Sequence, residues 1–233
     1  MRGRLTGYDC PVCRNKGFVY KMSGMTEVAQ PCTCMRVRDD VRRMTRSGLY
    51  DKLQVKTFES FRTQAPWQKL LRDRAALYAA KHDMPGFFIG GQPGSGKTHL
   101  CTAICAALLR QGMDVQYFVW ESYVKEILSR SSNADRDEWE KRMQPLLTAD
   151  AVYLDDFLRK ENPSQAERSV AFDVINRRYT EGKITIVSSE KDIVTLRQTD
   201  QAVAGRLCEM CGDTYCLNVD ADAGKDYRMR LRR

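Results

Sequence analysis

The sequence contains no apolar run long enough to span a bilayer, and residues 1–7 do not form the apolar core of a signal peptide. It also contains no repeat of fixed period and no low-complexity linker. The lack of a spanning run and of a signal peptide core argues against a membrane-spanning or secreted protein, so we expect a cytoplasmic location without membrane contact. The nine cysteines should then be reduced, which favours metal binding or core packing over disulfide bonds.

The 233 residues suit one domain of ordinary size plus a small appendage. A hydrophobic content of 42% and a charged content of 29% describe a globular chain that can bury a core. The net charge of +8 favours an anionic partner such as nucleic acid, although ordinary surface charge explains it equally well.

A glycine-rich stretch that ends at Thr98 matches the pattern G-x-x-x-x-G-K-[ST]. It lies between an apolar run that suits a buried strand and a sequence that suits a helix, as this motif requires. Glycines let backbone N–H groups wrap around a phosphate, Lys97 would reach the β- and γ-phosphates, and the Thr98 hydroxyl would ligate Mg²⁺. The predicted nucleotide-binding residues are Gly91, Gln92, Pro93, Gly94, Ser95, Gly96, Lys97, Thr98 and His99. We expect His99 to be a structural helix residue rather than a catalyst.

A second chemical element begins at Ala151, where four mostly apolar residues predict a buried strand that ends in two carboxylates. In an open α/β sheet, ligands bind outside the carboxyl ends of the strands. We therefore expect Asp155 to hold Mg²⁺ through its water shell. Asp156 is expected to orient or deprotonate the attacking water.

Two cysteine pairs, Cys10 with Cys13 and Cys32 with Cys34, flank a stretch that predicts a small hairpin. A hairpin can bring four thiolates together around Zn²⁺, and so small a module needs such a metal for its stability. Free thiols in a loose tail are the alternative. Another group is formed by Cys208, Cys211 and Cys216, and for it we favour packing over a second metal site, since no fourth ligand is evident.

The remaining predicted elements alternate between helices and strands. We predict helices over 66–81, 123–129, 136–147 with an interruption at Pro145, 163–179 and 202–210, and strands over 114–120, 183–189 and 214–219. Residues 35–46 carry five arginines on a predicted helix, which is either a solvated surface or a basic contact for nucleic acid or a partner. The predicted organisation is a zinc-binding module over 1–36, a basic helical connector over 37–62 and an ATPase domain over 63–233.

Several motifs together resemble the AAA+ ATPases of bacterial helicase loading, the DnaC/DnaI type. They are the sequence GKTHL at Gly96, LDDF at Leu154, AGRLCEM at Ala204 and TFESF at Thr57, and the front cysteine module fits as well. The resemblance covers nearly the whole chain. It implies an α/β fold in which a parallel sheet is flanked by helices, with the lid domain short or absent.

The resemblance also implies roles for two arginines and one serine. Arg206 matches the arginine finger that reaches the γ-phosphate of a neighbouring subunit, and Arg228 matches a second sensor for the chain's own nucleotide. The family usually has an asparagine sensor where this chain has Glu190, whose negative charge would repel phosphate. Either Ser189 takes over the sensing, or Glu190 turns away, or hydrolysis is slow.

Three functions follow as hypotheses. The first is a loader that binds ATP and Mg²⁺, associates with copies of itself and places a hexameric replicative helicase on single-stranded DNA. The second is a transposition ATPase of the IstB type, against which the cysteine module argues. The third is a nucleotide-gated, helicase-binding regulator with little turnover, which the residue Glu190 keeps open.

Overall fold

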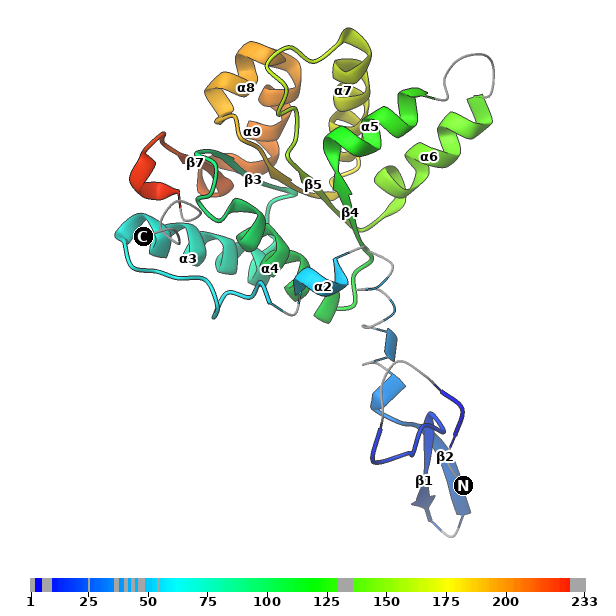
Figure 1. Ribbon diagram of the computed structural model, residues 1–233. Helices are drawn as coiled ribbons and strands as arrows, with labels where there is room; N and C mark the ends of the chain where they lie inside the picture. The colour runs from blue at the N-terminus through cyan, green and yellow to red at the C-terminus, as the bar shows by residue number, and fades with distance from the viewer. Residues whose placement is uncertain are drawn as a thin grey trace.

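Two β-sheets divide the chain into a small front module and a larger α/β domain (Figure 1). The computed structural model describes residues 3–5, 10–24, 26–35, 38–39, 42, 45, 49–53, 55–129 and 136–226. The front sheet is an antiparallel hairpin of β1 (Phe18–Ser23) and β2 (Thr26–Pro31). The two cysteine pairs lie just before β1 and just after β2, as the sequence predicts.

The larger sheet is entirely parallel, with the strand order β4-β5-β6-β3-β7. Its strands are β3 (Gly86–Gly91), β4 (Val115–Val119), β5 (Ala151–Asp155), β6 (Ile184–Ser188) and β7 (Cys216–Val219). Parallel neighbours need crossover connections, and most of these are helical. All five strands end at the same edge, which is where an open α/β sheet binds its ligands.

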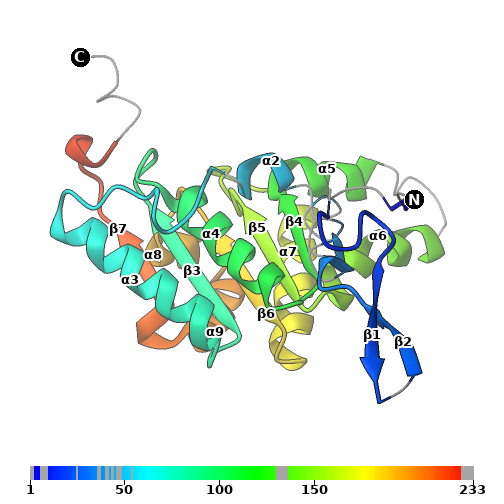
Figure 2. The ribbon, with the colours of Figure 1, turned by 90° about the horizontal axis from the view of Figure 1, so that it is seen from below.

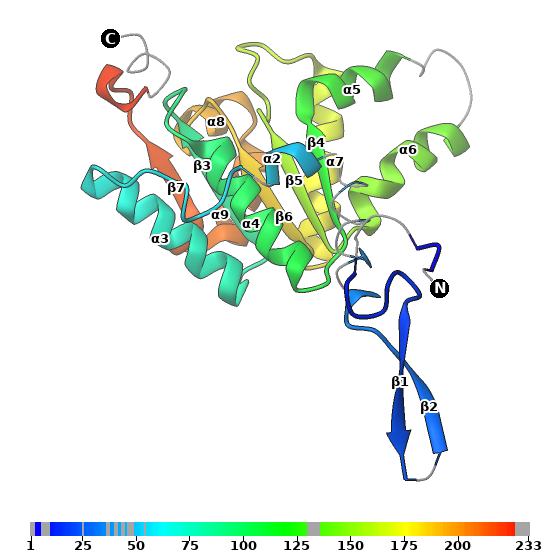
Figure 3. The ribbon, with the colours of Figure 1, turned by 60° about the horizontal axis from the view of Figure 1, so that its bottom comes forward.

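Helices cover both faces of this sheet (Figures 2 and 3). They are α2 (Tyr50–Leu53), α3 (Pro66–Lys81), α4 (Lys97–Arg110), α5 (Trp120–Ser129), α6 (Arg136–Thr148), α7 (Gln165–Thr180), α8 (Ile193–Thr199) and α9 (Gln201–Tyr215), followed by the short 3-10 turn η1 (Ala223–Lys225). The pair α3 and α4 packs on one face, and α7, α8 and α9 lie on the other. The predicted α/β class and the flanked parallel sheet are confirmed.

The central strands are mostly apolar and buried because both faces of the sheet are covered. Phe87, Phe88 and Ile89 of β3 are fully buried, and so are Tyr153 and Leu154 of β5. Such continuous apolar runs distinguish a covered parallel strand from the alternating pattern of a strand with one wet face.

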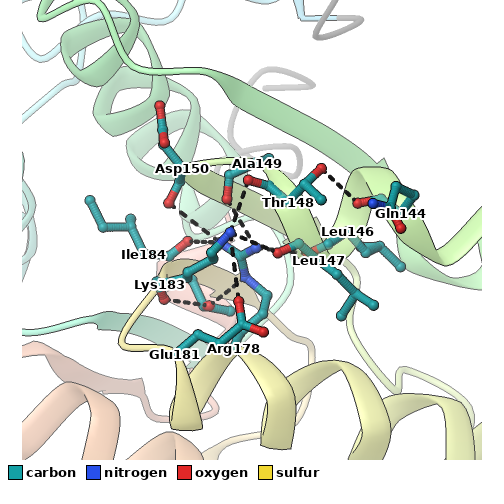
Figure 4. Close-up of polar contacts among 11 residues, drawn as sticks. Gln144, Leu146, Leu147, Thr148, Ala149, Asp150, Arg178, Glu181, Lys183 and Ile184 are labelled. Carbon is teal, nitrogen blue, oxygen red and sulfur yellow. Dashed lines mark hydrogen bonds and ion pairs between the residues drawn. The ribbon is translucent and has the colours of Figure 1, made fainter.

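Arg178, at the end of α7, ties α6 to the sheet (Figure 4). Its guanidinium donates to the carbonyl of Leu146 in the last turn of α6, to that of Ala149 just after the helix, and to that of Ile184. The predicted interruption of α6 at Pro145 is wrong, because the helix continues to Thr148. Pro145 removes one backbone N–H donor near the C-terminal end of α6. The carbonyls of Leu146, Leu147 and Thr148 in the last turn accept hydrogen bonds from the cations of Arg178 and Lys183.

Part of the predicted connector packs against the α/β domain. Leu49, Leu53 and Phe61 are 0%, 3% and 6% exposed and belong to the same apolar core as the central strands. These three side chains of the predicted connector therefore belong to the core of the α/β domain, and the boundary at residue 62 stays a prediction. Arg38, in contrast, is 1% exposed and donates to Asn15 of the front module.

Candidate nucleotide site and metal centre

The glycine-rich loop connects the end of β3 to the start of α4, as its motif requires. Gly94 and Gly96 adopt φ angles of 72° and 95°, which side chains with a Cβ rarely take. The ammonium of Lys97 lies inside the loop and donates to the carbonyls of Gly91 at 2.7 Å and Gln92 at 2.8 Å. The loop is therefore already curved around a cation at the N-terminus of a helix, an arrangement that suits phosphate.

Asp155 ends β5 beside this loop and accepts hydrogen bonds from four hydroxyl groups. Its Oδ1 atom lies 2.6 Å from Tyr153 Oη, 2.6 Å from Ser188 Oγ and 3.2 Å from Thr98 Oγ1. Its Oδ2 atom accepts from Tyr117 Oη at 3.0 Å. The structure thus brings the two predicted Mg²⁺ ligands, Thr98 and Asp155, into direct contact.

A pocket of about 160 Å³ opens above the loop. It is lined by Lys56, Pro93, Gly94, Gly96, Lys97, Thr98, His99, Asp156 and Glu190. Most of the predicted nucleotide-binding residues and the second carboxylate therefore share one cavity. Lys56, which the sequence analysis did not single out, comes to it from the predicted connector.

Asp156 and Glu190 face this pocket together, whereas Ser189 does not. Burial, the Asp155 charge and the Glu190 charge raise the pKa of Asp156. The side chain of Ser189 is fully buried and donates to the carbonyl of Phe157 at 2.8 Å. Of the three possibilities left open by the sequence, the one in which Glu190 turns away does not match its place in the pocket wall.

His99 fastens the loop helix to the connector. Its Nε2 atom lies 2.8 Å from the carbonyl of Thr57, which can only accept, so this nitrogen carries the proton. Its ring meets Phe61 edge to face with centroids 5.3 Å apart. Burial lowers the pKa of His99. These contacts match a structural residue that also borders the pocket.

Arg206 lies in α9, outside the residues that line the loop pocket. It donates through Nε to Asn176 Oδ1 at 2.6 Å, stacks over the Phe172 ring and is partly exposed. It borders a separate open depression together with Tyr179 and Glu209. Arg228, the predicted second sensor, lies outside the described residues.

The four front cysteines form one buried cluster. The Sγ atoms of Cys10, Cys13, Cys32 and Cys34 all lie within 4.8 Å of one another. The Gly17 N–H donates to Cys13 Sγ at 3.4 Å, which favours the thiolate that binds metal. Four convergent sulfurs are the donor set of a structural zinc site. In the part of the chain that the structure describes, no other group of this kind was found. Of the three cysteines for which packing is predicted, Cys211 is buried in the core and Cys216 is half-buried, whereas Cys208 is exposed, so the packing prediction is wrong for Cys208.

Comparison of the sequence with known protein families decides the family of this chain. Residues 27–207 match the family described as IstB-like ATP binding protein. The chain belongs to this family. With its phosphate loop and AAA+ fold, this IstB-like protein is an AAA+ ATPase.

Two curated relatives of the IstB-like protein differ in how much they share with it. The phage-like element PBSX protein XkdC of Bacillus subtilis is 29% identical over 95% of this chain and 86% of its own length. The replicative helicase loader DnaC of Escherichia coli is 26% identical over 62% of this chain, which spans only 59% of that protein.

Solved structures share the fold of the IstB-like protein. A crystal structure of the DnaC helicase loader has a TM-score of 0.59 at 17% identity, covering 73% of this chain and 99% of that one. DnaA of Aquifex aeolicus bound to AMPPCP has a TM-score of 0.58 at 18% identity, covering 76% and 53%. Among the described residues, no helix is long and apolar enough to cross a membrane.

Proposed function

We propose that this protein is an ATP-dependent loader of a hexameric replicative helicase onto single-stranded DNA in the cytoplasm. The observation that carries the proposal is the pairing of an AAA+ nucleotide site with a separate four-cysteine module on one chain. The relative DnaC, named as a replicative helicase loader, supports this class of partner. The net charge of +8 suits contact with DNA.

In the nucleotide site, the ammonium of Lys97 meets the phosphates and the loop amides wrap around them. The Thr98 hydroxyl and Asp155 carboxylate lie 3.2 Å apart and offer oxygen, the donor that Mg²⁺ prefers. When bound, the metal neutralises charge on the phosphates. Asp156 accepts a proton from the attacking water or orients it, and its raised pKa makes it a stronger base.

Hydrolysis depends on self-association. Arg206 lies outside its own loop pocket and borders an open depression, which supports a role toward a nucleotide held by a neighbouring copy. An arginine supplied from a neighbour stabilises charge in the transition state. Arg228 is assigned to the chain's own nucleotide as the second sensor.

The front module binds zinc and grips the helicase. Phe18, Tyr20 and Met22 alternate along β1 and share one face of the hairpin, where they are 39%, 57% and 68% exposed. Such a row of exposed apolar side chains suits a protein contact. Substituting Tyr20 with serine should weaken that contact, whereas Lys21→Ser, on the opposite face, provides a matched control.

The deciding experiment is capture of a purified replicative helicase by the tagged full-length protein in the presence of ATP and zinc. A loader retains the helicase and accelerates its unwinding of a forked DNA duplex that has single-stranded tails, and Tyr20→Ser weakens both effects. Retention on DNA without the helicase would favour the IstB-type transposition function instead. Capture that suppresses unwinding, with little ATP turnover, would favour the regulator, for which Glu190 in the pocket wall is the supporting observation.

A further inference from the structure

A short helix of the predicted connector is fixed against the α/β domain. Leu49 and Leu53 bracket Lys52, and both are buried in the main core. The N–H groups of Lys52 and Leu53 donate to the carbonyl of Leu49 at 2.8 and 3.0 Å. Helix α2 lies beside α4, which begins at the phosphate loop (Figures 2 and 3). The backbone of Lys52 is therefore held in a defined place.

From this position, Lys52 reaches a tyrosine of β4. Its Nζ atom donates to Tyr117 Oη at 2.7 Å and lies 4.5 Å from the centre of the Tyr117 ring. A tyrosine hydroxyl has one proton, and the ammonium occupies an acceptor site on its oxygen. The proton is then directed to Asp155 Oδ2, 3.0 Å away.

The two oxygens of Asp155 are held differently. Three hydroxyls, those of Tyr153, Ser188 and Thr98, converge on Oδ1. On Oδ2, the hydroxyl of Tyr117 is the donor that the structure records. Because Oδ1 is saturated by donors, Oδ2 is the oxygen with a lone pair for a metal ion or for a water bound to it. The direction of that lone pair depends on Tyr117.

We propose that Lys52 is a positioning residue for the Mg²⁺ carboxylate, acting through the hydroxyl of Tyr117 on Asp155 Oδ2. This inference rests on the proposed function in one respect, the role of Asp155 toward Mg²⁺. It goes further by assigning a part of the nucleotide site to the segment that joins the zinc module to the ATPase domain. Neither Lys52 nor Tyr117 is among the residues that line the loop pocket.

The test measures how much Mg²⁺ strengthens nucleotide binding. The affinity of the full-length protein for a fluorescent ATP analogue is measured once in the presence of Mg²⁺ and once in the presence of EDTA. The readout is the ratio of these two affinities. Lys52→Met keeps the aliphatic stem and removes the charge, and Tyr117→Phe removes the hydroxyl. Each should reduce the ratio by roughly three- to tenfold, since a hydrogen bond to a charged group is lost, and leave the affinity in EDTA unchanged.

A double variant and two controls complete the design. Lys52→Met combined with Tyr117→Phe should be no worse than Tyr117→Phe alone, because Lys52 acts only through that hydroxyl. Lys69→Met, on an exposed position of α3, should leave the ratio unchanged. An unchanged ratio in both single variants, or additive losses in the double variant, would overturn the positioning role.

Asp155→Asn separates this proposal from its premise. If that variant keeps the full Mg²⁺ effect, the metal role of Asp155 is wrong and the positioning role fails with it. If it loses the effect while both Lys52→Met and Tyr117→Phe retain it, only the positioning role is wrong, and helicase capture is unaffected. Tyr117→Phe preserves the shape of the site, so the inference can be tested even if Lys52→Met does not fold.

Discussion

Replacing Arg178 with methionine should destabilise the α/β domain without acting directly on nucleotide binding. The side chain of Arg178 is 0% exposed and forms five hydrogen bonds, one to Thr185 Oγ1 and four to backbone carbonyls. They join the end of α6 and the amino ends of β5 and β6 (Figure 4). This edge of the sheet is opposite to the one that carries the phosphate loop.

The magnitude follows from two opposing contributions. Hydrogen bonds from a charged donor contribute about 1.5 kcal/mol each, so the set is worth about 7 kcal/mol. Burial opposes this by lowering the pKa of Arg178 to about 10. That shift corresponds to a cost of about 3 kcal/mol, which Arg178→Met removes. The expected loss in the free energy of unfolding is therefore about 4 kcal/mol.

Urea unfolding followed by circular dichroism measures this loss. Arg177→Met is the matched control, because Arg177 is the preceding residue in α7 and is exposed. It should change the free energy of unfolding by less than about 0.5 kcal/mol. ATP affinity without urea should be unchanged in both variants. A loss below about 1 kcal/mol for Arg178→Met would refute the reasoning, because the carbonyls would then have adequate partners elsewhere.

Four further predictions concern the sites. Lys97→Ala should weaken ATP binding at least about tenfold in calorimetry, since a charged contact to the phosphates is lost. Metal analysis should find about one Zn²⁺ per chain, and Cys10→Ser should abolish it. Glu190→Gln removes one of the charges that raise the pKa of Asp156, so the fall in ATPase rate at acidic pH should move to lower pH. An unchanged dependence of the ATPase rate on pH would exclude Asp156 as the base. Arg206→Ala and Asp156→Asn should each lower ATP turnover, Arg206→Ala on the order of a thousandfold. Mixing the two variants should restore part of the turnover, and no recovery would exclude a site shared between neighbouring copies.

Local sequence predicted the parts of the molecule in which chemistry and chain order coincide. The phosphate loop needs a strand before it and a helix after it, and both are present around Lys97. Asp155 was predicted because an apolar strand runs directly into it. The four-cysteine cluster was predicted because cysteine pairs on either side of a hairpin approach one another.

The hydroxyl cluster around Asp155 could not be predicted in this way. Tyr117 and Ser188 are 38 and 33 residues away in sequence and meet the carboxylate only when three strands align. Tyr153 is the exception, because two residues along a strand point to the same face. Helix α8 was also missed, since seven residues give too short a pattern, although Asp192 caps its N-terminus.

The packing of Phe61 has a consequence for dissecting the chain. A Cβ atom placed on Gly96 would lie 2.6 Å from Phe61 Cε2, so the phosphate loop rests against a side chain that precedes the predicted ATPase domain. A truncated chain that starts at residue 63 would lose this support together with Leu49 and Leu53 of the core. It would then bind ATP poorly without losing any of the predicted nucleotide ligands. Cuts placed before Leu49 avoid mistaking a damaged core for a requirement for the zinc module.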